Sequence, residues 1–255
     1  MRNVWIICRR ELSSNFSSSI AWLLLTMYSL IFGYFFWNLV SYFVQNAMEM
    51  QMMGQTGSVN INEEIIRPLL ANNAFLEILF IPLITMRLFA EEKRNGTIEL
   101  LATSPVRDAE IILGKWFAAL LLYCWLLLFT GLNFAFLFRY GHPDWRTMAI
   151  GYLGLILQGA ALLAIGTFLS TLTKNQIIAG VTTFGACLLL WVFAWVGNYN
   201  SASWAQVLSY LSVLSHSESF GKGVLEIKDA VYYLSFIFLG LFLTTRSMES
   251  LRWRS

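Results

Sequence analysis

Long stretches without a charged side chain leave this sequence few possible folds. Five runs contain no Asp, Glu, Lys or Arg, and a sixth, 68–86, is interrupted only by Glu77. A helix needs about 20 mainly apolar residues to cross a bilayer, and an average soluble domain carries about twice the 13% of charged residues found here. The sequence therefore predicts an all-α, polytopic membrane protein. The five runs are 12–48, 116–138, 147–173, 175–217 and 230–245.

Six membrane-spanning helices fit these runs within one transmembrane domain, 1–255. Residues 1–16 place Val4, Ile7, Cys8 and Leu12 at helical spacing, which predicts an amphipathic helix on the inner membrane surface. The outer segment 199–229 is rich in Asn and Ser at its start, so we expect a half-embedded helical segment before the last span. The expected spans are about 20–42, 70–90, 111–138, 148–173, 176–198 and 230–246.

The basic residues predict the orientation of these spans. Six spans put both ends of the chain on one side, and twelve of the 17 Lys and Arg residues fall on that side. By the positive-inside rule, we expect a bacterial inner-membrane protein with both termini in the cytosol. The twelve are Arg2, Arg9, Arg10, Arg87, Lys93, Arg94, Arg107, Lys115, Lys174, Arg246, Arg252 and Arg254; the other five are Arg67, Arg139, Arg146, Lys222 and Lys228.

Several kinds of chemistry find no support in the sequence. The three cysteines are far apart, and His142 and His216 stand alone, so neither a metal centre nor a hydrolytic triad is indicated. The net charge of +2 is too small to suggest nucleic-acid binding. No phosphate-binding Gly-x-x-x-x-Gly-Lys-Ser/Thr loop occurs, so we expect no bound cofactor and no enzymatic activity in this chain. Any ATPase would be a separate chain.

The most charged part of the chain, 87–115, connects the second and third expected spans. Gly96 predicts a helix stop, and Thr97 can cap a short helix that follows it. Ser104 and Pro105 then form an N-cap and first-turn pair that would open the third span. We interpret the segment as a rigid charged protrusion suited to docking on another protein. The alternative is a solvated cytosolic loop that only anchors the spans.

This segment resembles the type-2 family of ABC transporter permeases. The family pattern is Arg-x-x-Ala-Glu-Glu-Lys-x-x-Gly-Thr-x-Glu-x-Leu-x-x-x-Pro, and the six spans with an amphipathic N-terminus extend the likeness over the whole chain. The tail from Phe220 to Thr244 is similar to the branch associated with gliding motility. The matching residues are Arg87, Ala90, Glu91, Glu92, Lys93, Gly96, Thr97, Glu99, Leu101 and Pro105, with Gly114 and Lys115 behind them.

The resemblance implies a coupling segment, 91–105, that docks into a cleft of an ABC ATPase. ATP and Mg would then bind the partner ATPase, and two permease copies or homologues would pair in the membrane. The branch further implies a membrane-anchored extracytoplasmic partner, and no nucleic acid is expected. Within the segment, the charges Glu91, Glu92, Lys93, Arg94 and Glu99 would set the register, while Ile98, Leu100 and Leu101 would supply buried contact.

Two charged residues inside the second span stay open to more than one interpretation. Glu77 either faces a cavity or subunit interface or lies near the outer end within reach of water, while Arg87 is expected to snorkel to the inner headgroups. Two other functions remain alternatives to an ABC exporter subunit. One is a membrane scaffold that recruits a cytosolic partner without transport, and the other is a secondary transporter, for which only Glu77 offers an ion-coupling group.

Overall fold

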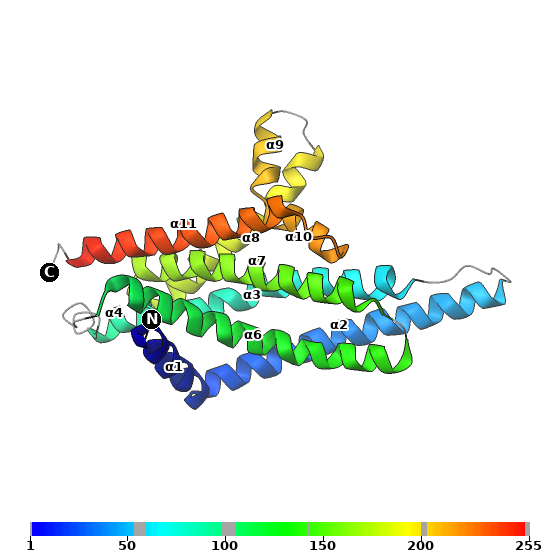
Figure 1. Cartoon of the computed structure of the whole chain (residues 1–255), viewed down its shortest axis with the longest axis horizontal. Coiled ribbons are helices and arrows are strands. Elements are labelled where there is room, and N and C mark those ends of the chain that lie inside the picture. Colours follow the sequence, from blue (N-terminus) through cyan, green and yellow to red (C-terminus); the bar gives the residue numbers. More distant parts are fainter. Residues whose placement is uncertain (1, 54–59, 98–105, 142, 200–202, 253–255) are drawn as a thin grey trace.

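The computed structural model describes residues 2–53, 60–97, 106–141, 143–199 and 203–252, and no strand occurs in these ranges. Six helical segments within them are long and apolar enough to cross a membrane. They form an elongated bundle with both termini near one end (Figure 1), which confirms the predicted all-α polytopic fold. The segments are built on α2 (Ser19–Met52), α3 (Arg67–Thr85), α6 (Asp108–Tyr140), α7 (Trp145–Leu172), α8 (Gln176–Tyr199) and α11 (Ile227–Arg252).

Three of these helices form the centre of the bundle. In the most apolar part of each span, 67% of the residues are buried for the span containing α3 and 61% for α6 and for α7. The corresponding values are 28% for α2 and α11 and 17% for α8. The peripheral helices expose large apolar side chains such as Trp37 and Phe238, which is what a lipid-facing surface requires.

Glycines on α7 allow its neighbours to approach closely. A Cβ atom added at Gly159 would lie 2.4 Å from a ring carbon of Tyr123 on α6, and one at Gly166 would lie 2.5 Å from Thr85 on α3. Small residues at helix contacts are typical of membrane proteins, where association depends on close packing. The sequence of α7 therefore dictates tight contacts on more than one of its sides.

The N-terminal helix α1 (Arg2–Ser17) packs on α6 and α2 near the end of the bundle where the termini lie (Figure 1). Its predicted apolar stripe is turned toward the bundle: Cys8 is buried, whereas Arg9 and Arg10 are exposed. Burial raises the pKa of the Cys8 thiol, so this side chain acts as an apolar packing group. The predicted helix and its packed apolar stripe are confirmed, whereas its position on the inner membrane surface stays a prediction.

The connection between the first two spans contains more helix than the sequence suggested. The expected span ended near residue 42, but α2 continues to Met52 because the residues that follow favour a helix until Gly54. The chain is helical again from a π-helical turn, η1 (Asn62–Ile66), which leads directly into α3. The interval 43–69, which the expected spans leave between them, is therefore mostly helix in the ranges that the structure describes.

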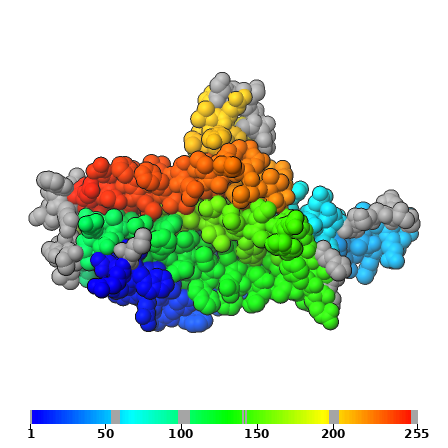
Figure 2. All heavy atoms as spheres, viewed as in Figure 1, coloured from blue at the N-terminus to red at the C-terminus, as the bar shows by residue number. Residues whose placement is uncertain are grey.

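The segment expected to be half-embedded before the last span contains two short helices. α9 (Ser203–Tyr210) ends before Ser212, whose side chain accepts a hydrogen bond from the Leu214 N–H and starts α10 (Val213–Gly221). α10 packs on α7, whereas α9 and the adjoining end of α8 project from the side of the bundle (Figures 1 and 2). A turn follows α10, with Gly223 at a φ of 76°.

His216 on α10 joins this segment to the last span. Its Nδ1 lies 2.7 Å from Asp229 Oδ1 on α11, and its Nε2 lies 2.9 Å from the Tyr210 carbonyl oxygen. The ring also stacks on Tyr232, with centroids 3.9 Å apart. This buried histidine is therefore a packing and hydrogen-bonding group that fixes α10 against α11.

Candidate functional site

The helix α4 (Ala90–Asn95) carries the first part of the predicted coupling segment, at the same end of the bundle as the termini (Figure 1). It begins where the buried Ser170 hydroxyl, at the end of α7, accepts hydrogen bonds from the Phe89 and Ala90 N–H groups, at 3.1 and 3.2 Å. It ends at Gly96, whose φ of 72° lies in the left-handed region where glycine is favoured. The helix stop expected at Gly96 is thus present.

A second attachment joins α4 to the same end of α7. Lys93 Nζ donates a hydrogen bond to the carbonyl oxygen of Thr171. The Thr171 hydroxyl in turn lies 2.8 Å from the hydroxyl of Ser247 on α11. The start of α4 is therefore held by two consecutive residues of α7, and that end of α7 is held by the last span.

A third attachment is an ion cluster around Lys115 of α6. The Lys115 side chain is only 2% exposed, and its Nζ lies 2.9 Å from Glu92 Oε1 and 3.0 Å from Glu11 Oε1. It also lies 5.4 Å from the centroid of the Phe89 ring. Arg10 contacts Glu11 at 3.3 Å, so two cations and two carboxylates balance in charge. Because buried charges need partners, this cluster ties α1, α4 and α6 together.

The structure separates the predicted segment residues into two groups. Glu91, Glu92 and Lys93 are partly buried, and the latter two are engaged inside the chain. Arg94, Gly96 and Thr97 are exposed and so remain accessible to a partner. Thr97 donates its backbone N–H to the Glu92 carbonyl oxygen at 3.0 Å, which closes the end of α4. The remaining predicted residues lie outside the described residues: Ile98, Glu99, Leu100, Leu101 and Pro105.

The third span begins at Asp108, and the expected opening at Ser104 and Pro105 is not where α6 starts. The Glu110 carboxylate accepts hydrogen bonds from the Arg107 backbone N–H at 3.3 Å and from Asn3 Nδ2 at 3.0 Å. A carboxylate in the first helical turn satisfies free N–H groups and suits the helix dipole. This arrangement sets the start of α6 and ties it to α1.

Glu77 lies apart from α4, inside the bundle. Its side chain is fully buried, and the Tyr123 hydroxyl of α6 lies 2.5 Å from Glu77 Oε1. The expectation that it lies within reach of water is wrong, because α3 begins ten residues earlier and α6 and α7 close around it. Arg87 lines a small cleft with Asn15 and Ser18, so it faces α1 and the start of α2.

Sequence reasoning missed two residues that hold α4. Ser170 is 80 residues from Ala90, and Glu11 is 104 residues from Lys115. A local signal was present for Glu11 alone: it is the only acidic residue of α1, and its partner Lys115 is a lone cation where a charge-free run begins. Their meeting depends on how α1 and α7 pack, which spacing along the chain does not reveal.

Replacing Ser170 with alanine is expected to loosen the start of α4. Two buried N–H groups would lose their acceptor, and each such group costs about 1–3 kcal/mol. Hydrogen–deuterium exchange over 89–95 should therefore rise in Ser170→Ala. Ser235→Ala is the matched control, because that exposed hydroxyl donates to the Val231 carbonyl of its own helix. Equal exchange of 89–95 in both variants would contradict this role of Ser170.

Comparison of the sequence with known proteins identifies a family and two relatives of this chain. The profile of the ABC-2 family transporter proteins matches residues 5–244. The chain is 25% identical over 163 residues to the probable multidrug ABC transporter permease YbhR of Escherichia coli K12, and to its counterpart in strain O157:H7. The match covers 62% of this chain and 42% of YbhR, so the chain spans less than half the length of these relatives. Neither match distinguishes the gliding-motility branch, which stays a prediction.

Proposed function

Because the chain belongs to the ABC-2 family of transporter proteins, we propose that it is the transmembrane subunit that couples ATP hydrolysis by a separate ATPase chain to movement of a substrate or to work on the cell envelope. The observation that carries this proposal is the triple attachment of α4 to α1, α6 and α7. The chain itself performs no chemistry in this scheme, since ATP and Mg bind the ATPase.

The attachments make α4 a mechanical part of the bundle. Docking places the exposed end of α4 and the segment after it, through 105, in a cleft of the ATPase. When that cleft moves, Ser170 and Thr171 pass the displacement to α7, and Lys115 passes it to α6 and α1. A helix joined only by a loose linker would move without its neighbours. Buried hydrogen bonds and ion pairs resist such separation because breaking them leaves unpaired groups.

The same scheme places α4 and both termini in the cytosol, at the inner face of a bacterial inner membrane. Two features support this orientation. Twelve of the 17 basic residues belong to segments expected on that side, and α4 lies at the end of the bundle where the termini are found (Figure 1). The exposed apolar surfaces of α2, α8 and α11 provide area for a second copy or a homologue in the membrane.

Docking is tested by co-purification with ABC ATPases encoded beside the gene. We expect wild type to retain such an ATPase. The variant Arg94→Glu/Leu101→Asp should retain at least about tenfold less ATPase, because one substitution reverses a charge and the other replaces an apolar contact with a charge. Arg9→Glu, at an exposed position of α1, is the control and should bind normally.

Three results bear on the alternatives. Failure of wild type to bind any ATPase, or full binding by the double variant, would contradict docking through this segment. Normal function with an ATPase that cannot hydrolyse ATP would instead indicate a scaffold. Transport that stops when the ion gradient collapses, while ATP remains, would indicate a secondary transporter.

A further inference from the structure

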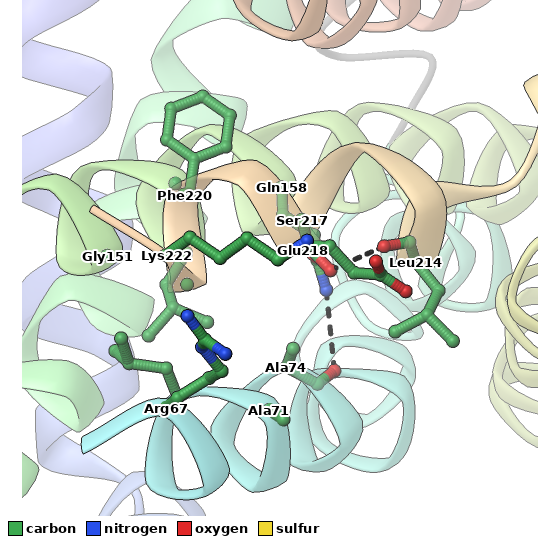
Figure 3. A pocket seen from close by; sticks show the side chains of 14 residues that line it. Arg67, Ala71, Ala74, Gly151, Gln158, Leu214, Ser217, Glu218, Phe220 and Lys222 are labelled. Carbon is green, nitrogen blue, oxygen red and sulfur yellow. Dashed lines mark hydrogen bonds between the residues drawn. The ribbon is translucent and has the colours of Figure 1, made fainter. Parts of the chain in front are cut away.

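A cavity of about 260 Å³ lies between α3, α7 and α10 (Figure 3). Its walls are mostly apolar, with Leu70, Leu155 and Phe220 among the lining side chains. At roughly 30 Å³ for each water-sized group, the cavity holds about nine such groups. This space suits part of an amphiphile rather than a whole two-chain lipid.

Close helix contacts frame this cavity. A Cβ atom at Gly151 would lie 2.3 Å from Leu70 Cδ1, and one at Gly154 would lie 2.5 Å from Phe220 Cβ. The two glycines of α7 thus let α3 and α10 approach on either side. Because the surrounding contacts are this tight, the empty space is a defined feature of the packing.

Two cations border the cavity without a protein partner. Arg67 begins α3 and Lys222 directly follows α10, and Arg67 Cγ lies 3.9 Å from a Cβ placed on the adjacent Gly221 (Figure 3). Among the described residues, neither side chain makes a hydrogen bond or an ion pair. Glu218 is the one acidic side chain that lines the cavity, so the charged lining sums to +1.

One buried polar side chain, Gln158, also lines the cavity. Gln158 is 2% exposed, and its Nε2 donates to the Ala74 carbonyl oxygen at a long 3.4 Å (Figure 3). The Gln158 side chain also hydrogen-bonds the Glu77 carboxylate, and its Oε1 accepts from the Tyr233 hydroxyl at 3.4 Å, so this amide is engaged within the bundle. Arg67 also follows the π-helical turn η1, and such turns occur frequently at functional sites.

We propose that this cavity binds an anionic phosphodiester lipid, with its phosphate between Arg67 and Lys222 and the adjoining part of the lipid inside the apolar walls. The net charge of +1 favours a lipid with one negative charge over a zwitterionic one. Both cations lie at helix ends, where headgroups meet the protein. The site goes beyond the proposed function, which names no ligand, and it does not depend on ATPase docking.

The test is native mass spectrometry of the purified full chain released from nanodiscs that contain equal phosphatidylglycerol and phosphatidylcholine. Wild type should retain phosphatidylglycerol in preference to phosphatidylcholine. Arg67→Gln/Lys222→Gln should lower this preference about tenfold, since two charge-assisted contacts are lost. Ala71→Phe, which narrows the cavity without changing its charge, should also reduce retention of the lipid. Arg146→Gln is the control, because the Arg146 guanidinium lies over the Trp145 ring, and it should retain wild-type preference.

Three outcomes would overturn the proposal. The first is equal retention of both lipids by wild type. The second is unchanged preference in both the charge and the cavity variants, provided that their helicity matches wild type. The third is displacement of the bound lipid by millimolar inorganic phosphate, which would identify a site for free phosphate. ATPase co-purification with the same variants separates this result from failure of the proposed function, because Arg67 and Lys222 lie outside the coupling segment.

Discussion

Lys115→Met is expected to destabilise the folded chain by roughly 3–5 kcal/mol, the usual cost of removing one partner from a buried ion pair. The methionine fills a similar space, but the Glu92 carboxylate loses the cation that lies 2.9 Å away. Glu11 keeps its contact with Arg10, so we expect the loss of stability mainly at α4, which carries Glu92. The measurement is thermal unfolding of the purified protein in nanodiscs.

Two further variants separate charge from packing in this prediction. Lys115→Met/Glu92→Gln removes the orphaned carboxylate and should recover most of the lost stability. Lys174→Met, at an exposed position of the same end of the bundle, should change the unfolding free energy by no more than about 0.5 kcal/mol. A double variant as unstable as the single one would show that the ion cluster does not hold α4.

Gly159→Leu is the second substitution with a large expected effect, a loss of roughly 2–6 kcal/mol of folding stability. Overpacking of a tight core costs about 1–3 kcal/mol, and a buried polar group left without its partner costs a similar amount. Both terms apply because the new side chain displaces the Tyr123 ring, whose hydroxyl lies 2.5 Å from Glu77 Oε1.

The control for this prediction is Gly185→Leu on α8. A Cβ atom at Gly185 meets nothing within 4 Å, so a leucine there should be tolerated. Thermal unfolding of the two variants, at matched lipid composition, gives the comparison. Equal unfolding midpoints would mean that α6 and α7 are not packed as tightly at Gly159 as the structure indicates.

The sequence predicts the membrane architecture well because lipid imposes a strong rule on composition. A spanning helix must be long and apolar, so charge-free runs indicate the spans, and the apolar stripe of α1 indicates its packed face. The residues at which helices begin and end are harder to predict. α2 extends to Met52 because polar helix formers continue a helix as readily as apolar ones, and Ser212 starts a second helix within the segment 199–229.

The candidate site is predictable only in part. The charges and the Gly96 stop of the coupling segment are local signals, and they indicate α4 correctly. Which of those charges face inward depends on residues far along the chain, namely Ser170, Thr171 and Lys115. Glu77 illustrates the same limit, since its burial follows from contacts with α6 and α7 rather than from its place in a span.

The central claim, that α4 passes movement of the ATPase to the spans, is tested most directly by hydrogen–deuterium exchange of the complex with ATP and with ADP. The wild-type complex should show a nucleotide-dependent change of exchange in α6 and α7. Ser170→Ala/Lys93→Met, which releases α4 from α7, should still bind the ATPase but lose the change in α7. An unchanged nucleotide response of α7 in this variant would contradict the account.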